Sequence, residues 1–428
     1  MPDPRPLLRP VLPLLLCLLA WPAQAQLAGL PGGGLPTTLP QVRDTVQRLP
    51  RTVRDTIQAV PVRTPTVEQL LRRHPARVEL DPAGAPVVRS EVVAIDPAAA
   101  ALELARDAGF DVGRTRSLEP LGLRLVVLRA PDGLGTAAAL EQLRRLDPAG
   151  TYDFNHLYFG SGAVGTGTGA AAGTDVAATG GGVRVGLVDS GVDAGHPAMA
   201  GVDVRHWGCD GRVVPDGHGT AVASLLVGGE DGGDGGTLFA ADIYCGQPAG
   251  GAADGFAEAM AWLAQQDVGV INISLVGPHN ALVQRATAAL AARGHVLVAA
   301  VGNDGPASPP LFPAAYPGVI GVTAVDPRGR ALPEAVRGAQ VDFAARGSQV
   351  RAARSGGGWT TVRGTSFAAP LVARAAAHGL GRRDEAVARK VRERLAVTAR
   401  DLGEDGRDDT YGFGLVEARP AVAAGGSR

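Results

Sequence analysis

The chain has 428 residues, which is long for a single domain. Its 41 basic and 42 acidic side chains give a formal net charge of −1, so the composition gives no sign of a nucleic-acid or membrane-surface partner. Hydrophobic residues make up 45% of the chain, which is enough for a sizeable core. The 60 glycines and 32 prolines predict many loops and at least one unstructured stretch.

The first 25 residues have the pattern of a signal peptide. Arg5 and Arg9 precede an apolar run over residues 11–21, and Ala23-Gln24-Ala25 forms a small-residue cleavage motif. The apolar run is well short of the ~20 residues that a spanning helix needs. We therefore expect cleavage before Gln26, no membrane association afterwards, and a secreted or periplasmic protein. An uncleaved membrane anchor is the alternative.

Three segments follow before the main domain. Residues 26–86 are a low-complexity lead-in, interrupted by prolines, for which we predict a linker with one or two short amphipathic helices. Residues 87–158 predict a small ferredoxin-like α+β domain with the element order β-α-β-β-α-β. Residues 159–182 consist almost entirely of Gly, Ala, Thr and Ser and predict a flexible linker.

Residues 183–428 predict a parallel α/β domain. Continuous apolar strands alternate with helices, which is typical of a parallel sheet flanked by helices. The expected strands are 183–188, 238–244, 268–274, 296–301 and 319–325. One helix is expected to begin near residue 217, and four others are expected at 252–265, 281–293, 365–380 and 384–398. Active sites of such sheets lie at the carboxyl ends of the strands.

Four polar residues lie in separate motifs at predicted strand ends or helix starts. Asp189 follows a strand in Val-Asp-Ser-Gly-Val, and Asn303 follows another in Ala-Val-Gly-Asn-Asp-Gly. His218 opens a helix in Gly-His-Gly-Thr, and Ser366 opens another in Gly-Thr-Ser-Phe-Ala-Ala-Pro. Each residue alone has an ordinary structural explanation, such as a helix cap or a turn. Their joint occurrence in this order favours catalysis.

The residue types fit nucleophilic hydrolysis. A serine hydroxyl such as that of Ser366 needs a nearby base, and the pKa of histidine suits His218 to this role. A buried carboxylate, here Asp189, holds the imidazole in one tautomer. An amide such as that of Asn303, together with the backbone N–H of Ser366, can stabilise the oxyanion.

With these four motifs in the order Asp, His, Ser, residues 183–420 resemble the subtilisin/kexin-like serine protease (subtilase) family. The resemblance implies a secreted serine endopeptidase that hydrolyses peptide bonds in proteins through an acyl-enzyme intermediate. It also implies a subtilisin-like parallel sheet, and an inhibitory propeptide at residues 87–158. We expect self-cleavage between about His156 and Gly162, with the bond after Tyr158 as a candidate. A permanently retained binding domain is the alternative for residues 87–158.

The same resemblance implies a substrate-binding strand at Ser274, Leu275, Val276 and Gly277, which pairs with extended peptides. The family usually has glycine where this chain has Val276. A valine side chain there narrows the first specificity pocket. The expected partners are therefore protein or peptide substrates and the chain's own propeptide, which acts as an intramolecular inhibitor. We expect a monomer that binds neither nucleic acid nor, after signal cleavage, a membrane.

After removal of the signal peptide only Cys209 and Cys245 remain. In an exported protein such a pair predicts a disulfide, and two buried free thiols are the alternative. No Cys/His cluster predicts a metal, and the chemistry requires no cofactor. Structural calcium is usual in the family, but no ligand loop is recognisable. The acidic segments at 230–234 and at Asp405, Asp408 and Asp409 are compatible with calcium and with mobile acidic turns alike.

Two other function classes are the alternatives to a peptidase. The first alternative is a catalytically silent binding scaffold. Such a scaffold would not need Asp189, His218, Asn303 and Ser366, so the presence of all four argues against it. A lipase or esterase would need Gly-x-Ser-x-Gly, but Ala368 stands where the second glycine belongs, and serine would come first in the chain order. Peptidase activity is therefore the preferred prediction.

Overall fold

A computed structural model of the protein describes residues 63–164, 184–229, 233, 235–378, 380 and 385–417. The predicted signal peptide at 1–25, most of the 26–86 lead-in and most of the 159–182 linker lie outside these residues. None of the helices in the described part of the chain is long and apolar enough to cross a membrane.

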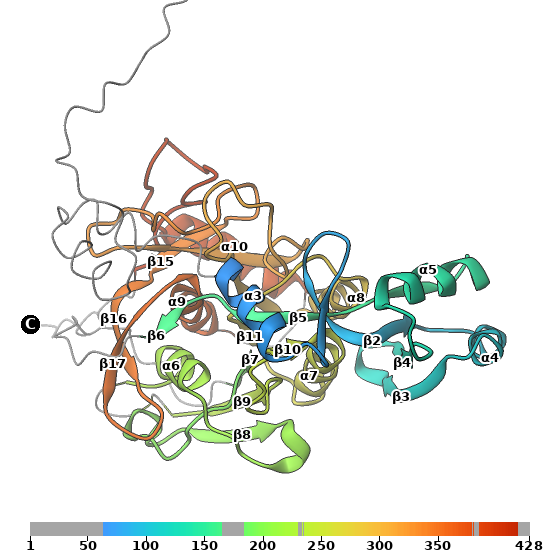
Figure 1. Cartoon of the computed structure of the whole chain (residues 1–428). Helices are drawn as coiled ribbons and strands as arrows, with labels where there is room; N and C mark the ends of the chain where they lie inside the picture. Colours follow the sequence, from blue (N-terminus) through green and yellow to red (C-terminus); the bar gives the residue numbers. More distant parts are fainter. Residues whose placement is uncertain are drawn as a thin grey trace, which may run out of the picture. The chain divides into compact units, whose positions relative to one another are not determined.

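Seven strands form the main sheet of residues 184–417 (Figure 1). Their order is β15-β14-β13-β11-β7-β9-β8, and every neighbouring pair is parallel. The bounds are β7 Arg184–Asp189, β8 Asp203–Trp207, β9 Thr237–Asp242, β11 Val270–Ile273, β13 Val296–Ala300, β14 Val319–Val325 and β15 Phe343–Arg346. The inner strands β11, β13 and β14 are buried at every residue because both faces of the sheet are covered.

Helices pack on both faces of this sheet. Alternate residues of β13 point to opposite faces, so Val298 joins a core cluster with α6, α9 and α10, whereas Leu297 joins one with α7 and α8. The helices are α6 Gly217–Leu226, α7 Ala253–Gln265, α8 Ala281–Ala292, α9 Thr365–Ala377 and α10 Glu385–Thr398. The predicted parallel sheet flanked by helices is confirmed, with element ends within a few residues of those expected.

The segment before this sheet folds as a small α+β domain, named here the small domain (residues 86–160). Its elements follow the predicted β-α-β-β-α-β order, and its antiparallel sheet has the order β5-β2-β4-β3. Leu102 and Leu140 of its two helices pack on Val126 of the sheet. The bounds are β2 Pro86–Ile95, α4 Ala99–Asp107, β3 Asp111–Leu118, β4 Leu123–Arg129, α5 Thr136–Leu146 and β5 Thr151–Gly160, with a 3-10 turn η1 Glu119–Leu121.

The predicted boundaries of the two linkers need correction. Helix α3 Arg63–Arg73 agrees with the short helices predicted for the lead-in, but strand β1 Val78–Leu80 also lies there. Strand β1 pairs with β2, and Leu70 and Val78 pack on Leu157. At the other end, β5 continues to Gly160 and a further strand, β6 Ala163–Val164, follows. Strand pairing uses backbone groups, so a run of small residues conceals it in the sequence.

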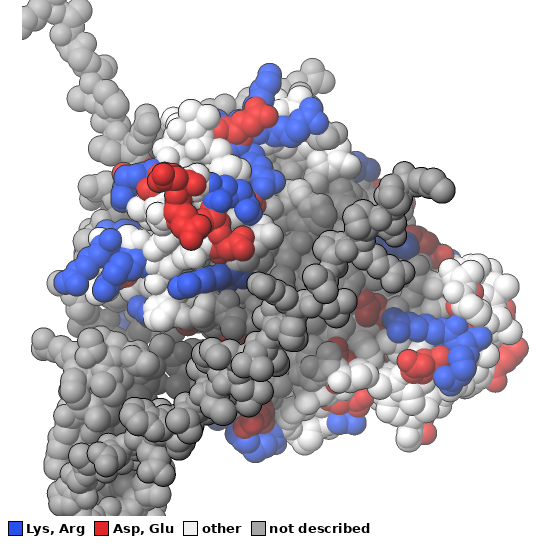
Figure 2. Space-filling model, turned by 90° about the horizontal axis from the view of Figure 1, so that it is seen from above, with Lys and Arg blue, Asp and Glu red and all other residues white. Residues whose placement is uncertain are grey.

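A third sheet has the order β16-β17-β6, in which β16 covers Ser348–Ala353 and β17 covers Trp359–Arg363. The two short 3-10 turns η2 Pro197–Met199 and η3 Cys209–Gly211 flank β8. On the face drawn in Figure 2, side chains of both charge signs are interspersed over the described residues.

Candidate active site

Asp189 and His218 are brought together where β7 ends and α6 begins. The fully buried carboxylate of Asp189 accepts a hydrogen bond of 2.8 Å from Nδ1 of His218. Asp216 caps α6 by accepting from the backbone N–H of His218, and the hydroxyl of Ser190 donates to Asp216. The Asp-Gly-His motif thus starts the helix and orients the imidazole at the same time.

Two carboxylates control the charge state of His218. Burial lowers the pKa of the imidazole, but the charge and hydrogen bond of Asp189 and the charge of Asp216 outweigh it, so the pKa of His218 is raised. Only 13% of the His218 side chain is exposed. Its Nε2 atom has no hydrogen-bond partner among the described residues and is therefore free to accept a proton.

Ser366 lies in the first turn of α9. Its hydroxyl donates to the carbonyl of Ser274 over 2.9 Å, and the Ser274 hydroxyl donates to the carbonyl of Ser366 over 2.8 Å. Asn303, just beyond β13, accepts from the backbone N–H of Thr365 over 3.2 Å. Gly364 precedes the helix with a φ of 137°, a conformation that favours glycine. The loop after β13 and the start of α9 are thereby joined around the serine.

The chain's own residues 157–164, named here the cleavage segment, run through this site. The carbonyl oxygen of Ser161 accepts from Nδ2 of Asn303 and, over 3.3 Å, from the backbone N–H of Ser366. The backbone N–H of Ser161 donates to Oγ of Ser366 over 2.8 Å. The two predicted oxyanion donors therefore hold the carbonyl of the Ser161–Gly162 peptide bond.

Before that bond, the cleavage segment is the middle strand of three. Antiparallel pairing joins it to β10 Gly251–Ala252 on one side and to β12 Leu275–Val276 on the other. Of the predicted substrate strand, Leu275 and Val276 pair with Gly160 and Phe159, whereas the backbone of Gly277 pairs with Phe312.

A deep pocket holds Tyr158, which is fully buried. Its ring centre lies 5.3 Å from that of Phe256, and its hydroxyl donates to the carbonyl of Pro278 over 3.0 Å. A Cβ atom on Gly277 would lie 2.6 Å from the Tyr158 ring, so the pocket needs glycine there. Val276, in contrast, is buried with Leu311 and Val336 in a small apolar cluster.

After the bond, the cleavage segment pairs with β17. Ala163 and Val164 of β6 lie opposite Arg363 and Val362 in antiparallel register. Residue 363 directly precedes Gly364, so the strand that receives this part of the segment leads into the Ser366 turn. Both sides of the Ser161–Gly162 bond are thus held by main-chain pairing.

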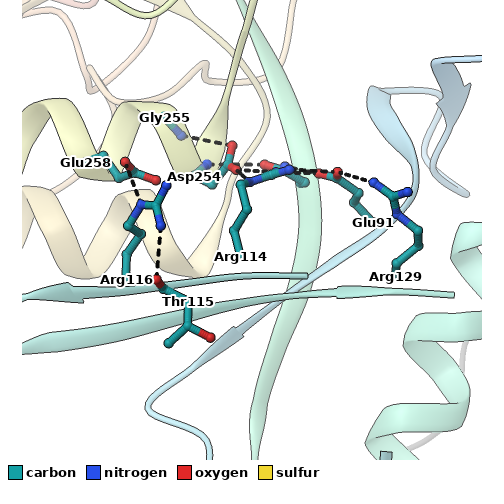
Figure 3. A network of polar contacts seen from close by, with 9 residues as sticks. Glu91, Arg114, Thr115, Arg116, Arg129, Asp254, Gly255 and Glu258 are labelled. Carbon is teal, nitrogen blue, oxygen red and sulfur yellow. Dashed lines mark hydrogen bonds and ion pairs between the residues drawn. The ribbon is translucent and has the colours of Figure 1, made fainter. Parts of the chain in front are cut away.

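Side chains of the small domain also dock on α7. Figure 3 shows Arg114 between Glu91 and Asp254, at 2.8 Å and 2.6 Å, and Arg116 beside Glu258 at 3.4 Å. Burial lowers the pKa of Arg114, but its hydrogen bonds and the charges of its two carboxylate partners outweigh this, and the pKa is raised. Glu91 and Asp254 have only 9% exposed side chains, and Arg114 compensates both charges, while Arg129 also lies 3.9 Å from Glu91.

A second polar contact joins the small domain to α8. Asn280 caps that helix and donates through Nδ2 to the Phe154 carbonyl and to Nδ1 of His156. Nε2 of His156 then faces Asp81 at 3.1 Å.

Comparison with known proteins identifies the chain's relatives. Residues 180–414, more than half of the chain, match the family model described as the subtilase family. The chain belongs to the subtilase family. Subtilisin DY of Bacillus licheniformis is 32% identical to this subtilase over 257 residues, which are 56% of this chain and 90% of subtilisin DY. Subtilisin BL of Lederbergia lenta is 31% identical over 255 residues, covering 57% and 92% of the two chains.

A solved structure agrees at the level of the fold. Fervidolysin from Fervidobacterium pennivorans, a keratinolytic enzyme related to subtilisin, superposes with a TM-score of 0.67 at 20% identity. The match covers 80% of this subtilase and 61% of the fervidolysin chain. The subtilase is a serine endopeptidase of the subtilisin type, a hydrolase that acts on proteins or peptides.

Cys209 and Cys245 are joined by a disulfide with Cα atoms 5.1 Å apart, which links the loops after β8 and β9. Asp242 lies near both sulfur atoms, and these three form the one group of metal-ligand type among the described residues; the S–S bond uses both thiols. Of the acidic segment at 230–234, only Gly233 is described. Asp408 caps a turn by accepting from the backbone N–H groups of Thr410 and Tyr411.

The sequence placed the expected cleavage within residues 156–162 but did not single out Gly160, Ser161 and Gly162 as the residues beside Ser366. Their composition suggested a linker, although three small residues in succession also suit a close backbone approach. Phe367 was visible only as part of the serine motif. Its ring packs against His218 with centres 5.3 Å apart, which is a contact between different helices.

Proposed function

We propose that this subtilase is made as a precursor that cleaves its own Ser161–Gly162 bond, with Ser366 as nucleophile, His218 as base and Asp189 as the residue that orients the base. The position of the Ser161 carbonyl between Asn303 and the Ser366 N–H carries the proposal. The bond lies within the window of residues 156–162 expected from the sequence. The bond after Tyr158 is disfavoured because the two donors hold the carbonyl of Ser161, whereas Tyr158 pairs with Gly251.

The reaction follows from these contacts. The Ser366 hydroxyl turns from the Ser274 carbonyl to Nε2 of His218, gives up its proton and attacks the Ser161 carbonyl carbon. Negative charge develops on the Ser161 oxygen, where the two donors already lie. The C–N bond to Gly162 then breaks as His218 returns the proton to the leaving amine. Water, deprotonated by His218, finally releases Ser161 from Ser366.

We further propose that the small domain stays docked after cleavage and inhibits the enzyme. The strand Leu157–Gly160 would continue to fill the groove between β10 and β12, where substrates would bind as the same kind of extended strand. The ionic contacts of Arg114 support this role. Release of the domain would then open the site to other proteins.

Export and assembly form the last part of the proposal. The charged start, apolar run and Ala-Gln-Ala motif of residues 1–25 support removal as a signal peptide and a secreted or periplasmic location. The disulfide is compatible with an oxidising compartment. We propose a monomer that needs no cofactor for catalysis.

The test compares the full chain with its Ser366→Ala variant by intact mass. We expect the wild type to separate between Ser161 and Gly162 and the variant to keep that bond. Processing of both chains at the same position would assign the cut to another protease. A wild-type chain that never separates there, under conditions in which it is folded, would contradict self-processing and favour a permanent binding domain.

A further inference from the structure

Gly162, the residue directly after the proposed cleaved bond, lies against the ring of Phe367. A Cβ atom on Gly162 would stand 2.5 Å from Cε2 of Phe367, 3.1 Å from Cδ2 and 3.2 Å from Cζ. Cβ atoms in folded proteins essentially never approach other atoms to less than 3.0 Å. Any side chain at this position therefore requires the ring or the peptide to move.

The ring of Phe367 has little room to move. Phe367 is fully buried and belongs to the core cluster beneath α9. It also contacts the imidazole of His218, which is itself held by Asp189 over 2.8 Å. A shift of Phe367 would thus disturb either the core or the proposed base.

The peptide is equally constrained. Ser161 is held by Asn303 and Ser366, and Ala163 and Val164 pair with β17. On the other side, a Cβ atom on Gly364 would lie 2.7 Å from Cα of Gly162, so the backbones are already in close contact. Gly162 does not have the left-handed φ that would by itself demand glycine. The contact with Phe367 is what demands it.

We propose that Phe367 makes this subtilase selective for glycine immediately after the cleaved bond, so that its substrates are glycine-containing extended segments. The inference rests on the proposed cleavage at Ser161–Gly162 and names the substrate class of that site. Gly160, before the cleaved bond, also leaves no room for a side chain, because a Cβ atom there would lie 2.9 Å from Nε2 of His218. Helices and regular strands rarely offer glycines so placed, so glycine-rich linkers of folded proteins are the matching targets.

A double-mutant cycle in the full precursor tests the contact. Four chains are compared by the rate of self-cleavage, measured by intact mass: wild type, Gly162→Ala, Phe367→Ala and the double variant. We expect Gly162→Ala to slow cleavage at least about tenfold when Phe367 is present, because overpacking of a rigid site is unfavourable. In the Phe367→Ala chain the same substitution should change the rate by less than about threefold, which is the signature of direct coupling.

A matched control is Phe159→Leu, which alters the segment three residues earlier, in an apolar cluster with Leu157 that does not include Phe367, and should have the same effect whether or not Phe367 is replaced. Phe367→Leu replaces Phe367→Ala if the larger truncation prevents folding. Equal rates for the wild type and Gly162→Ala, both with Phe367 present, would overturn the inference. An undiminished penalty in the Phe367→Ala chain would overturn it as well.

A second readout separates this inference from the proposed function. In the Ser366→Ala background no cleavage is needed, and amide hydrogen exchange of residues 159–164 reports how firmly the segment is seated. We expect Gly162→Ala to speed this exchange about tenfold or more, and the added Phe367→Ala to reverse most of the effect. Unchanged exchange contradicts the Phe367 contact, whereas a wild-type chain that does not cleave itself contradicts only the proposed function.

Discussion

The two halves of strand β5 are held in different ways. Apart from backbone pairing with β2, side chains make most of the contacts in residues 151–156. Asp153 accepts from the N–H of Ala281, Asn155 donates to Glu91 within the small domain and accepts from the N–H of Asp254, and His156 and the Phe154 carbonyl meet Asn280. In residues 157–160, and in Ser161 directly after the strand, the backbone makes most of them, through β10, β12 and the donors around Ser366.

This difference separates recognition of the small domain from recognition of substrates. Matched polar side chains select one partner, because a wrong partner would leave buried charges unpaired. Backbone pairing accepts any extended segment whose side chains fit the pockets. Substitutions that contact the second half of β5 should therefore alter peptide hydrolysis in general. Substitutions that contact the first half, residues 151–156, should alter only how tightly the small domain is held.

The largest effect is expected for Asn303→Ala. The Nδ2 group of Asn303 contacts the Ser161 carbonyl oxygen, and loss of one such donor typically lowers kcat by about 10²- to 10³-fold. Self-cleavage, followed by intact mass, should slow by that factor, and so should peptide hydrolysis by the processed protein. The control is Gln340→Ala, which removes an amide from the protein surface. Undiminished self-cleavage in Asn303→Ala would show that charge does not develop on the Ser161 oxygen.

Arg114→Ala should have the next largest effect, and only on inhibition. Its loss leaves the nearly buried carboxylates of Glu91 and Asp254 without their shared cation. Because Arg114 itself is 41% exposed, we expect a modest gain, with peptidase activity appearing roughly tenfold sooner after self-cleavage.

Arg116→Ala is the matched control for this comparison. Arg116 pairs with Glu258 across the same surface, but over 3.4 Å and with more of both side chains exposed, so its loss should matter less. Once the small domain has been removed, both variants should hydrolyse peptides at the wild-type rate. An equal lag in the wild type and Arg114→Ala would mean that this network does not hold the small domain.

Val276→Gly tests the second half of the comparison, and we expect an effect of similar size. Val276 is buried with Leu311 and Val336, and its removal opens space beside the substrate strand. We expect kcat/KM to rise by about tenfold for peptides with a large apolar residue before the cleaved bond, relative to peptides with serine there. Phe256→Leu is the contrasting variant, because it should instead weaken the preference for tyrosine at the position of Tyr158. An unchanged preference in Val276→Gly would show that Val276 does not limit the first pocket.

How much of this could be read from the sequence depends on how local each feature is. Asp189, His218, Asn303 and Ser366 stand in motifs whose positions at strand ends and helix starts follow from local patterns. The structure joins Asp189 to His218 and places Asn303 against the start of the helix that carries Ser366. The small domain was also predictable, since its strands and helices alternate in the ordinary way.

The remaining features depend on contacts between distant parts of the chain. Ser161 meets Ser366 across 205 residues, and no local pattern marks a Gly-Ser-Gly stretch as a seated strand rather than a linker. A short helix such as α3 was predicted for the lead-in, but the packing of its Leu70 on Leu157 was not, because that contact joins distant parts of the chain. Burial of Phe367 against Gly162 could not be inferred from either motif separately.

The smallest effect concerns pH and involves two histidines. His218 of α6 lies beside Gly160 in the second half of β5, and His156 belongs to the first half. His218 must be neutral to take a proton, and its pKa is raised, so self-cleavage should decline as the pH falls through a value above the ordinary histidine pKa of about 6.5. Asp216→Asn keeps the helix cap but removes a charge that raises this pKa. The acid limb should then move to lower pH by a fraction of a unit, with a roughly twofold higher rate on that limb.

The comparison variant for this profile is His156→Gln, which changes the histidine of the docking half while leaving His218 intact. If proton transfer sets the profile, Asp216→Asn displaces the acid limb and His156→Gln does not. The reverse result would mean that seating of the small domain, through the contacts of His156 with Asp81 and Asn280, limits the reaction. In that case the two halves of β5 could not be treated as independent, because the recognition half would also govern the rate of cleavage.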